Sequence, residues 1–142
     1  MTSVLIIGGG GMIGQKLASS FSKNDSLTLL DIGFPNKNQS NARKMIGSVG
    51  DPEIIENSLK DLPEVIYYLA SVVSGEAEAD FSKGWDVNIH AFWAFLSLVK
   101  KLNEKSQGQY KPKIIFTSSI AVFGSPFPDQ IPDDFITAPR TS

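Results

Sequence analysis

A run of glycines between an apolar segment and a helical pattern constrains the fold of this sequence more than any other feature. Residues 4–18 read VLIIGGGGMIGQKLA. The apolar residues predict a buried strand over 4–7, and apolar side chains at helical spacing predict a helix over 12–21. A helix that starts directly after such a turn offers free N–H groups and a partial positive charge, which suits a phosphate group. A tight turn that binds nothing is the alternative.

The glycines fit two spacings at once. Gly9, Gly11 and Gly14 form G-x-G-x-x-G, whereas Gly8, Gly11 and Gly14 form G-x-x-G-x-x-G. Either spacing lets the backbone approach a ligand closely, because a Cβ atom would intrude there. The residues of the turn leave both spacings open.

An acidic residue supports the interpretation of the turn as a dinucleotide site. Asp31 lies near the end of the predicted strand SLTLLDI at 26–32, twenty positions after Gly11. Dinucleotide-binding folds carry an acid at this place, and it accepts hydrogen bonds from the adenosine ribose. Its charge would repel a 2′-phosphate, and the three residues after Asp31 include no arginine, so the pattern favours NAD over NADP. A solvated acid at a strand end is the alternative.

Strand and helix patterns alternate along the rest of the chain. Strands are predicted over 45–49, 65–70 and 113–118, helices over 52–62 and 80–105, and loops over 33–44 and from 124 onward. Strands joined by helical crossovers predict an α/β fold, a doubly wound parallel sheet of the Rossmann type in the order 3-2-1-4-5. The length of 142 residues suits one domain over 1–142.

Composition excludes several classes of function. The net charge is −2 and no basic patch occurs, so we expect no binding to nucleic acid or to an anionic membrane. The chain has no cysteine, which excludes disulfides and thiolate metal sites, and we expect no metal site. His90 is the only histidine and lacks triad partners, which favours a surface position. No segment reaches the roughly 18 apolar residues of a membrane span, and we expect a cytoplasmic protein.

Four stretches in order resemble the extended short-chain dehydrogenase/reductase superfamily, also called the NAD-dependent epimerase/dehydratase family. They are the glycine turn, YYLASVVSGEAEADF, DVNIHAFWAF and IIFTSSIAVFG. Within it, VVSGEAEADF is similar to the D-erythronate dehydrogenase-like branch. The resemblance implies that Gly8, Gly11 and Gly14 are the working glycines. Gly9 and Gly10 would be permissive turn residues, and the backbone N–H groups of Met12 and Ile13 would face the pyrophosphate.

The resemblance implies roles for further residues. Asp51 would reach the adenine amino group, and it can also cap the helix that starts at 52. Asn88 would belong to the cofactor site as a brace between the helix and the strand. The alternative is an ordinary polar residue of the helix. Ser119 would be the catalytic serine that orients the substrate oxygen, or else a strand-end serine that bonds backbone. The nicotinamide ribose side would be lined by Leu69, Ala70 and Ser71, and Ser74 and Glu76 would lie near the substrate.

The sequence departs from the family in one respect. The general base of the family is the tyrosine of Y-x-x-x-K, and this motif is absent: the residues four places after Tyr67, Tyr68 and Tyr110 are Ser71, Val72 and Ile114. We therefore expect the N-terminal part of a longer enzyme, truncated after about five strands, without the C-terminal substrate domain and inactive by itself. The sequence does not distinguish a natural truncation from a fragment.

The residues and the resemblance together predict an NAD-binding portion of an oxidoreductase that oxidises a polyhydroxy acid such as D-erythronate. A nucleotide-sugar epimerase or dehydratase is one alternative, and a non-catalytic dinucleotide-binding module is another. The apolar residues of the helix over 80–105 spread over more than one face. We expect a homodimer through this helix, since extended members of the family pair through two helices each.

Overall fold

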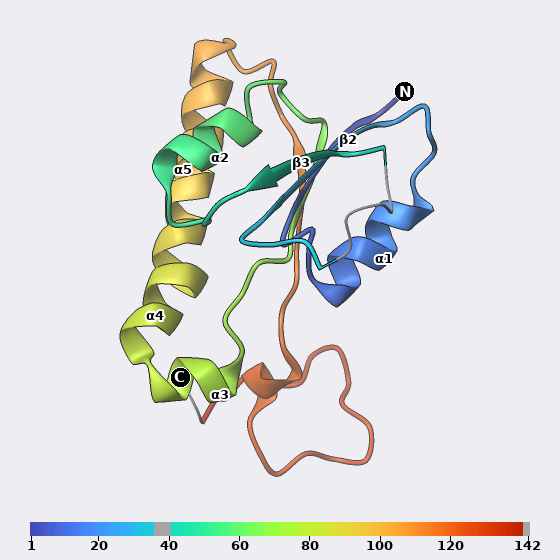
Figure 1. Cartoon of the computed structure of the whole chain (residues 1–142). Coiled ribbons are helices and arrows are strands. Elements are labelled where there is room, and N and C mark those ends of the chain that lie inside the picture. Colours follow the sequence, from blue (N-terminus) through green and yellow to red (C-terminus); the bar gives the residue numbers. More distant parts are fainter. Residues whose placement is uncertain (36–40, 141–142) are drawn as a thin grey trace.

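The sheet has the predicted topology. In the computed structural model, which describes residues 1–35 and 41–140, five parallel strands lie in the order β3-β2-β1-β4-β5 (Figure 1). The strands are β1 (Ser3–Ile7), β2 (Ser26–Asp31), β3 (Arg43–Ile46), β4 (Val65–Tyr68) and β5 (Lys113–Phe116). The central strand β1 pairs with β2 and β4, so that Ile7 stands opposite Leu30 and Tyr68. The predicted Rossmann-type sheet is confirmed.

Helices cover both faces of the sheet because neighbouring side chains of β1 point to opposite sides. Val4 and Ile6 pack toward α1, whereas Leu5 and Ile7 belong to the core that contains Phe95 of α5. The four apolar side chains of β1 are at most 1% exposed, which explains the continuous apolar run. The helices are α1 (Met12–Ser20), α2 (Pro52–Ser58), α3 (Ser74–Ala79), α4 (Phe81–Trp85) and α5 (Ala91–Lys105), with a π turn η1 (Asp86–His90) and a 3-10 turn η2 (Ile120–Phe123).

Several boundaries differ from the prediction. The third strand was expected over 45–49 but runs from Arg43 to Ile46, so it begins inside the expected loop over 33–44 and ends three residues early. The strand begins with two basic residues, which are common on exposed edge strands. Its pairing with β2 ends where Gly47 N–H donates to the Asp31 carbonyl oxygen. Residues 36–40 of that expected loop lie outside the described residues. Helix α3 and the turn η2 were missed because six and four residues are too short to show a helical period.

The carboxyl ends of the strands meet at one edge of the sheet, at the bottom of Figure 1, where α3 and the segment from 117 onward also lie. The last described segment closes into a loop, since Ala138 N–H donates to the Val122 carbonyl oxygen over 2.9 Å. Gly124 (φ +69°) lets the chain turn there. Among the described residues, no helix is both long and apolar enough to cross a lipid bilayer.

Candidate functional site

The glycine turn after β1 is closely packed. Gly8 has φ +88°, and its N–H and that of Gly9 both donate to the Leu30 carbonyl oxygen, over 2.8 and 3.0 Å. A Cβ atom on Gly14 would lie 2.3 Å from the Gly8 carbonyl oxygen. A Cβ atom on Gly11 would meet only that same oxygen, at 3.4 Å, so the space beside Gly11 is open. Among Gly8, Gly11 and Gly14, therefore, two glycines are sterically closed and Gly11 borders free space.

The expectation that Gly9 and Gly10 are merely permissive is wrong. A Cβ atom on Gly10 would lie 2.0 Å from the Gly33 carbonyl oxygen, and one on Gly9 would lie 2.8 Å from Leu29 Cβ. Both glycines face β2 and the residues that follow it. They allow the turn to pack directly against the neighbouring strand, a constraint that the spacing of the glycines does not reveal.

Asp31 joins the glycine turn to the end of β2. Its Oδ2 accepts a hydrogen bond from Gly10 N–H over 2.9 Å, and its Oδ1 accepts one from Gly33 N–H over 3.2 Å. The residue is half-buried, so the alternative of a fully solvated acid is wrong. An ionised carboxylate has about four acceptor positions, and it can accept from further donors after these two bonds.

The start of α1 has the features of an anion site. The N-cap residue Gly11 provides no side-chain cap, and Met12 and Ile13 are exposed. The first N–H groups of a helix have no partner inside the helix, and the helix dipole adds positive potential. With the open space at Gly11, these residues fit the pyrophosphate of a dinucleotide, and the nearby Asp31 carboxylate fits its ribose.

Asp51 caps α2, as expected for one of its two roles: its Oδ1 accepts from Glu53 N–H over 2.9 Å. It also lines a groove of about 870 Å³ between α2 and α5. Val49 and Val87 line the same groove, so a flat apolar ring could lie beside the Asp51 carboxylate. The cap uses Oδ1, so the second carboxylate oxygen can still accept a hydrogen bond, and both roles are compatible.

The residues after β4 lie against the glycine turn. Leu69 N–H donates to the Ile7 carbonyl oxygen, and a Cβ atom on Gly8 would lie 2.7 Å from Ala70 N. Leu69 and Ala70 are half-buried and Ser71 is exposed. The Asn88 side chain forms two hydrogen bonds with the backbone of Val72, the residue after Ser71. Its Oδ1 accepts from Val72 N–H (2.8 Å), and its Nδ2 donates to the Val72 carbonyl oxygen (3.0 Å). Asn88 thus joins the helix to the segment after β4.

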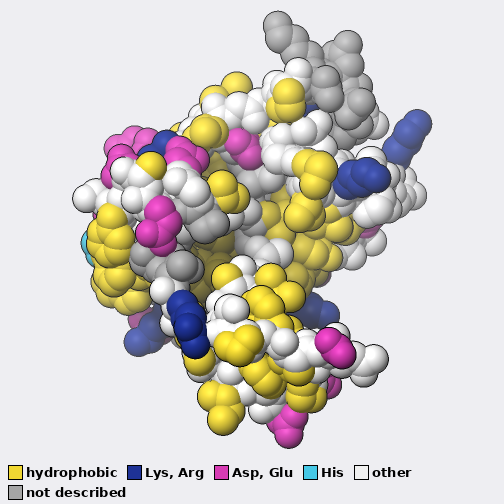
Figure 2. Space-filling view, turned by 90° about the horizontal axis from the view of Figure 1, so that it is seen from below, with side chains coloured by type: hydrophobic (Ala, Val, Ile, Leu, Met, Phe, Trp, Pro, Cys, Tyr) yellow, Lys and Arg dark blue, Asp and Glu magenta, His cyan; other side chains and the backbone are white. Residues whose placement is uncertain are grey.

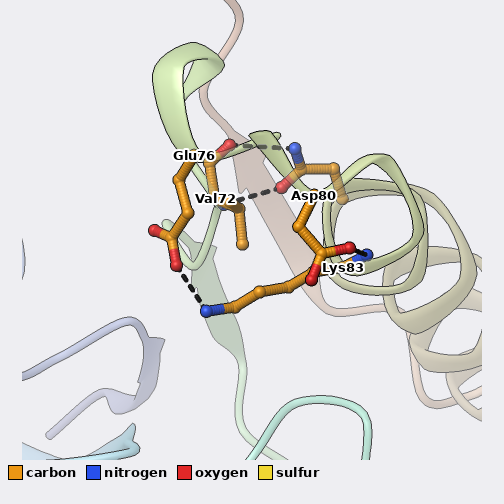
Figure 3. Close-up of polar contacts among 5 residues, drawn as sticks. Val72, Glu76, Asp80 and Lys83 are labelled. Carbon is orange, nitrogen blue, oxygen red and sulfur yellow. Dashed lines mark hydrogen bonds and ion pairs between the residues drawn. The ribbon is translucent and has the colours of Figure 1, made fainter. Parts of the chain in front are cut away.

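Helices α3 and α4 form a hairpin at this edge (Figure 3). Gly84 lies so close to Ala77 that a Cβ atom on it would be 2.7 Å from Ala77 Cβ. Glu76 accepts a hydrogen bond from Lys83 Nζ, and this bond and the Glu76 charge raise the pKa of the Lys83 ammonium group. Ser74 is the first residue of α3. The structure therefore gives Glu76 an internal partner, Lys83, which the sequence did not single out.

Ser119 lies just beyond β5 and is exposed. Its Oγ accepts from Ala121 N–H over 3.2 Å and caps η2. This is the backbone contact of the alternative interpretation. The hydroxyl hydrogen is still available as a donor, so the contact does not exclude a second bond.

Exposed apolar side chains gather at the carboxyl edge of the sheet. Figure 2 shows this edge from below, with apolar side chains across its middle and charged ones around them. Large apolar residues exposed at or just after strand ends are Met12, Ile13, Ile32, Ile46, Val73, Phe116 and Ile120. Ligands of open α/β sheets bind outside the carboxyl ends of the strands, and such apolar surface is typical of a binding site.

The fold and this edge define an α/β domain of the dinucleotide-binding type. The model of the NAD dependent epimerase/dehydratase family matches residues 4–141. The chain belongs to this family.

Relatives with assigned names are enzymes of about twice this length. The chain is 33% identical to the D-erythronate dehydrogenase of Cupriavidus necator, over 99% of this chain and 45% of the relative. It is 30% identical to the D-erythronate dehydrogenase of Haemophilus influenzae, over 98% and 44%. A crystal structure described as a nucleoside-diphosphate-sugar epimerase of Agrobacterium tumefaciens superimposes with a TM-score of 0.85 at 36% identity, over 99% and 44%. The chain spans less than half the length of these proteins.

Proposed function

We propose that residues 1–142 are the NAD-binding domain of an oxidoreductase that oxidises a polyhydroxy acid such as D-erythronate. The observation that carries this proposal is the hydrogen bond of 2.9 Å between Gly10 N–H and Asp31 Oδ2. It holds an acid at the end of β2 beside the glycine turn, where an adenosine ribose binds in folds of this type. The substrate class rests on the similarity to the two D-erythronate dehydrogenases.

The cofactor residues have separate tasks in this proposal. Gly8 and Gly14 shape the turn, Gly11 leaves room for the pyrophosphate, and the first N–H groups of α1, at Met12 and Ile13, donate to it. Asp31 binds the ribose hydroxyls and disfavours a 2′-phosphate by charge repulsion. The other cofactor contacts would come from Asp51 at the adenine and from Leu69, Ala70 and Ser71 at the nicotinamide ribose, with Asn88 as their brace.

NAD supplies the hydride acceptor when it is bound. On the substrate side, the Ser119 hydroxyl would bind the substrate oxygen and orient it, and Ser74 and Glu76 would lie near the substrate. The Ser119 hydroxyl bonds the Ala121 N–H rather than a basic side chain, and the chain has no Y-x-x-x-K motif. A base outside these residues would take the hydroxyl proton, so we propose that this chain alone has negligible turnover.

A nucleotide-sugar epimerase is the second candidate, and the similarity to the Agrobacterium tumefaciens structure supports it. The two candidates differ in net redox change: a dehydrogenase accumulates NADH, whereas an epimerase returns the hydride and accumulates none. The test is to incubate a version of the length of the relatives with NAD and either D-erythronate or a nucleotide sugar, and to follow NADH absorbance. NADH formed only with D-erythronate supports the first candidate. A sugar product without NADH contradicts it.

The chain itself is tested by NAD binding. Isothermal titration of the 142-residue chain should give weak binding through the adenosine half, and NADH absorbance in the presence of D-erythronate should stay flat. Binding of neither NAD nor NADP would support a domain without cofactor function and would contradict the proposal.

We place the enzyme in carbohydrate metabolism in the cytoplasm under the same proposal.

We also propose a homodimer through the helix over 80–105. Exposed apolar residues of this helix are Phe81, Trp85, Ile89, Trp93 and Leu96. Apolar surface of this extent on one helix is typical of an interface. Light scattering should show a concentration-dependent dimer, and a Trp93→Glu variant should shift it to monomer, because a charge in an apolar interface costs free energy. A strict monomer at all concentrations would contradict the dimer.

A further inference from the structure

Three side chains form a hydrogen-bonded relay around the π turn between α4 and α5. Trp85 Nε1 donates to His90 Nε2 over 2.8 Å, and His90 Nδ1 lies 3.0 Å from Asp86 Oδ1. An indole N–H can only donate, so Nε2 of the imidazole must be the acceptor. His90 is therefore neutral in this arrangement, with its proton on Nδ1 and directed at Asp86.

The contact between Trp85 and His90 requires the π turn. Residues five apart in a regular α-helix point about 140° away from each other, so an indole and an imidazole at these positions would not meet. Here Ala91 N–H donates to the Asp86 carbonyl oxygen, five residues earlier, which is the π pattern. The wider turn brings Trp85 and His90 to the same side, and their hydrogen bond exists only while the turn has this form.

The π turn sets the position of Asn88. Ala91 and Phe95 fix α5 in the core, since they are 3% and 0% exposed. Removing the extra residue of the turn would rotate everything before it by about 100° relative to α5. Asn88 would then leave Val72, and both hydrogen bonds to the segment after β4 would be lost.

We propose that Trp85, Asp86 and His90 are positioning residues: they hold the π turn that keeps Asn88 on Val72, and so fix the segment from Ser71 to Glu76 at the carboxyl edge of the sheet. The consequence for catalysis rests on the proposed function, whereas the mechanical link does not.

The link is tested by hydrogen exchange of the Val72 amide in the 142-residue chain at neutral pH. His90→Leu should speed this exchange about fivefold, the equivalent of one net hydrogen bond. His90→Gln should restore slow exchange, because its amide can accept from Trp85 and donate to Asp86. Lys100→Ala on α5 is the matched control, and the Ile66 amide in β4 is the internal one. If His90→Leu unfolds the chain, Trp85→Phe is the second variant, because it removes only the indole N–H donor and keeps an aromatic ring.

Wild-type exchange at Val72 in a folded His90→Leu or Trp85→Phe chain would overturn the proposal. The experiment uses neither NAD nor substrate, so a failure here leaves the proposed function intact, and the reverse also holds.

Discussion

The two halves of the carboxyl edge are built differently. At the ends of β1 and β2, backbone N–H groups of Gly8, Gly9 and Gly10 all have acceptors, and Asp31 is half-buried. At the end of β5, Ser119 is exposed and Phe116 is 53% exposed. The first half is stabilised by contacts among residues 6–33, whereas the second has little that covers it. The comparison indicates that the half proposed for the cofactor is formed in advance, whereas the half proposed for the substrate is left exposed.

The largest expected effect is at Gly14, where the glycine turn leaves no room for a side chain. Gly14→Ala should destabilise the chain by about 3 kcal/mol and abolish NAD binding, because the new Cβ atom would lie 2.3 Å from a backbone oxygen. Gly11→Ala is the matched control: it should cost less than about 1 kcal/mol of stability, yet weaken NAD binding. Urea denaturation measures the stability of each variant, and isothermal titration measures its binding of NAD. Equal destabilisation by both variants would contradict the difference between closed and open glycines.

The next effect concerns the exposed half. Ser119→Ala in a version of the length of the relatives should lower kcat about 100-fold through lost orientation, with unchanged affinity for NAD. Its cost in stability should be about 1 kcal/mol or less, since only the cap of η2 is lost. Steady-state kinetics measure the rate, and Ser118→Ala serves as the control. A rate near that of the unaltered enzyme would show that Ser119 is only a cap.

Asp31 tests the half that is formed in advance. Asp31→Ala should weaken NAD binding about tenfold, because the ribose loses an acceptor and Gly10 N–H loses its partner. Asp31→Ala combined with Ile32→Arg should shift the preference toward NADP, because a guanidinium can bind a phosphate. Titration with both cofactors gives the ratio. An unaltered chain that already prefers NADP would contradict the proposed role of the charge.

The smallest effect compares two buried tyrosines. Tyr110 Oη donates to the Pro63 carbonyl oxygen over 3.1 Å, whereas Tyr68 Oη, at the end of β4, has no hydrogen-bond partner among the described residues. Tyr110→Phe should therefore destabilise the chain by about 1 kcal/mol, and Tyr68→Phe should be neutral or slightly stabilising. Urea denaturation at pH 8 distinguishes the two, and an equal loss in both variants would contradict the difference.

The same tyrosines predict the alkaline limit of stability. Burial raises the pKa of Tyr68 to about 12 and that of Tyr110 to about 12, above the ordinary value of about 10. The folded state keeps these protons longer than the unfolded state, so stability is fully present below about pH 10 and falls as the pH rises toward 12. Denaturation at pH 8 and pH 11 should show this loss, and Tyr68→Phe should reduce it.

Much of the sheet, and the part of the candidate site formed by the glycine turn and Asp31, could be predicted from the sequence because the controlling contacts are local. The apolar run of β1 and the distance of twenty positions from Gly11 to Asp31 both follow from a strand, a turn, a helix and the next strand. The spacing of the glycines did not reveal why Gly9 and Gly10 are glycines. Their closest neighbours, Leu29 Cβ and the Gly33 carbonyl oxygen, belong to β2 and to the residues that follow it, and parallel pairing brings that strand beside the turn.

The sequence by itself determined the order of the strands, the glycine turn and the acid beside it, because a right-handed crossover and a helical period leave few other arrangements. Tertiary structure alone decided the details at the ends of β4 and β5. Asn88 and Val72 are sixteen residues apart, and their bonds depend on a π turn that no periodicity predicts. The pairing of Glu76 with Lys83 likewise depends on two short helices packed at Ala77 and Gly84, a contact of the Ala77 methyl group with the Gly84 backbone that neither segment encodes alone.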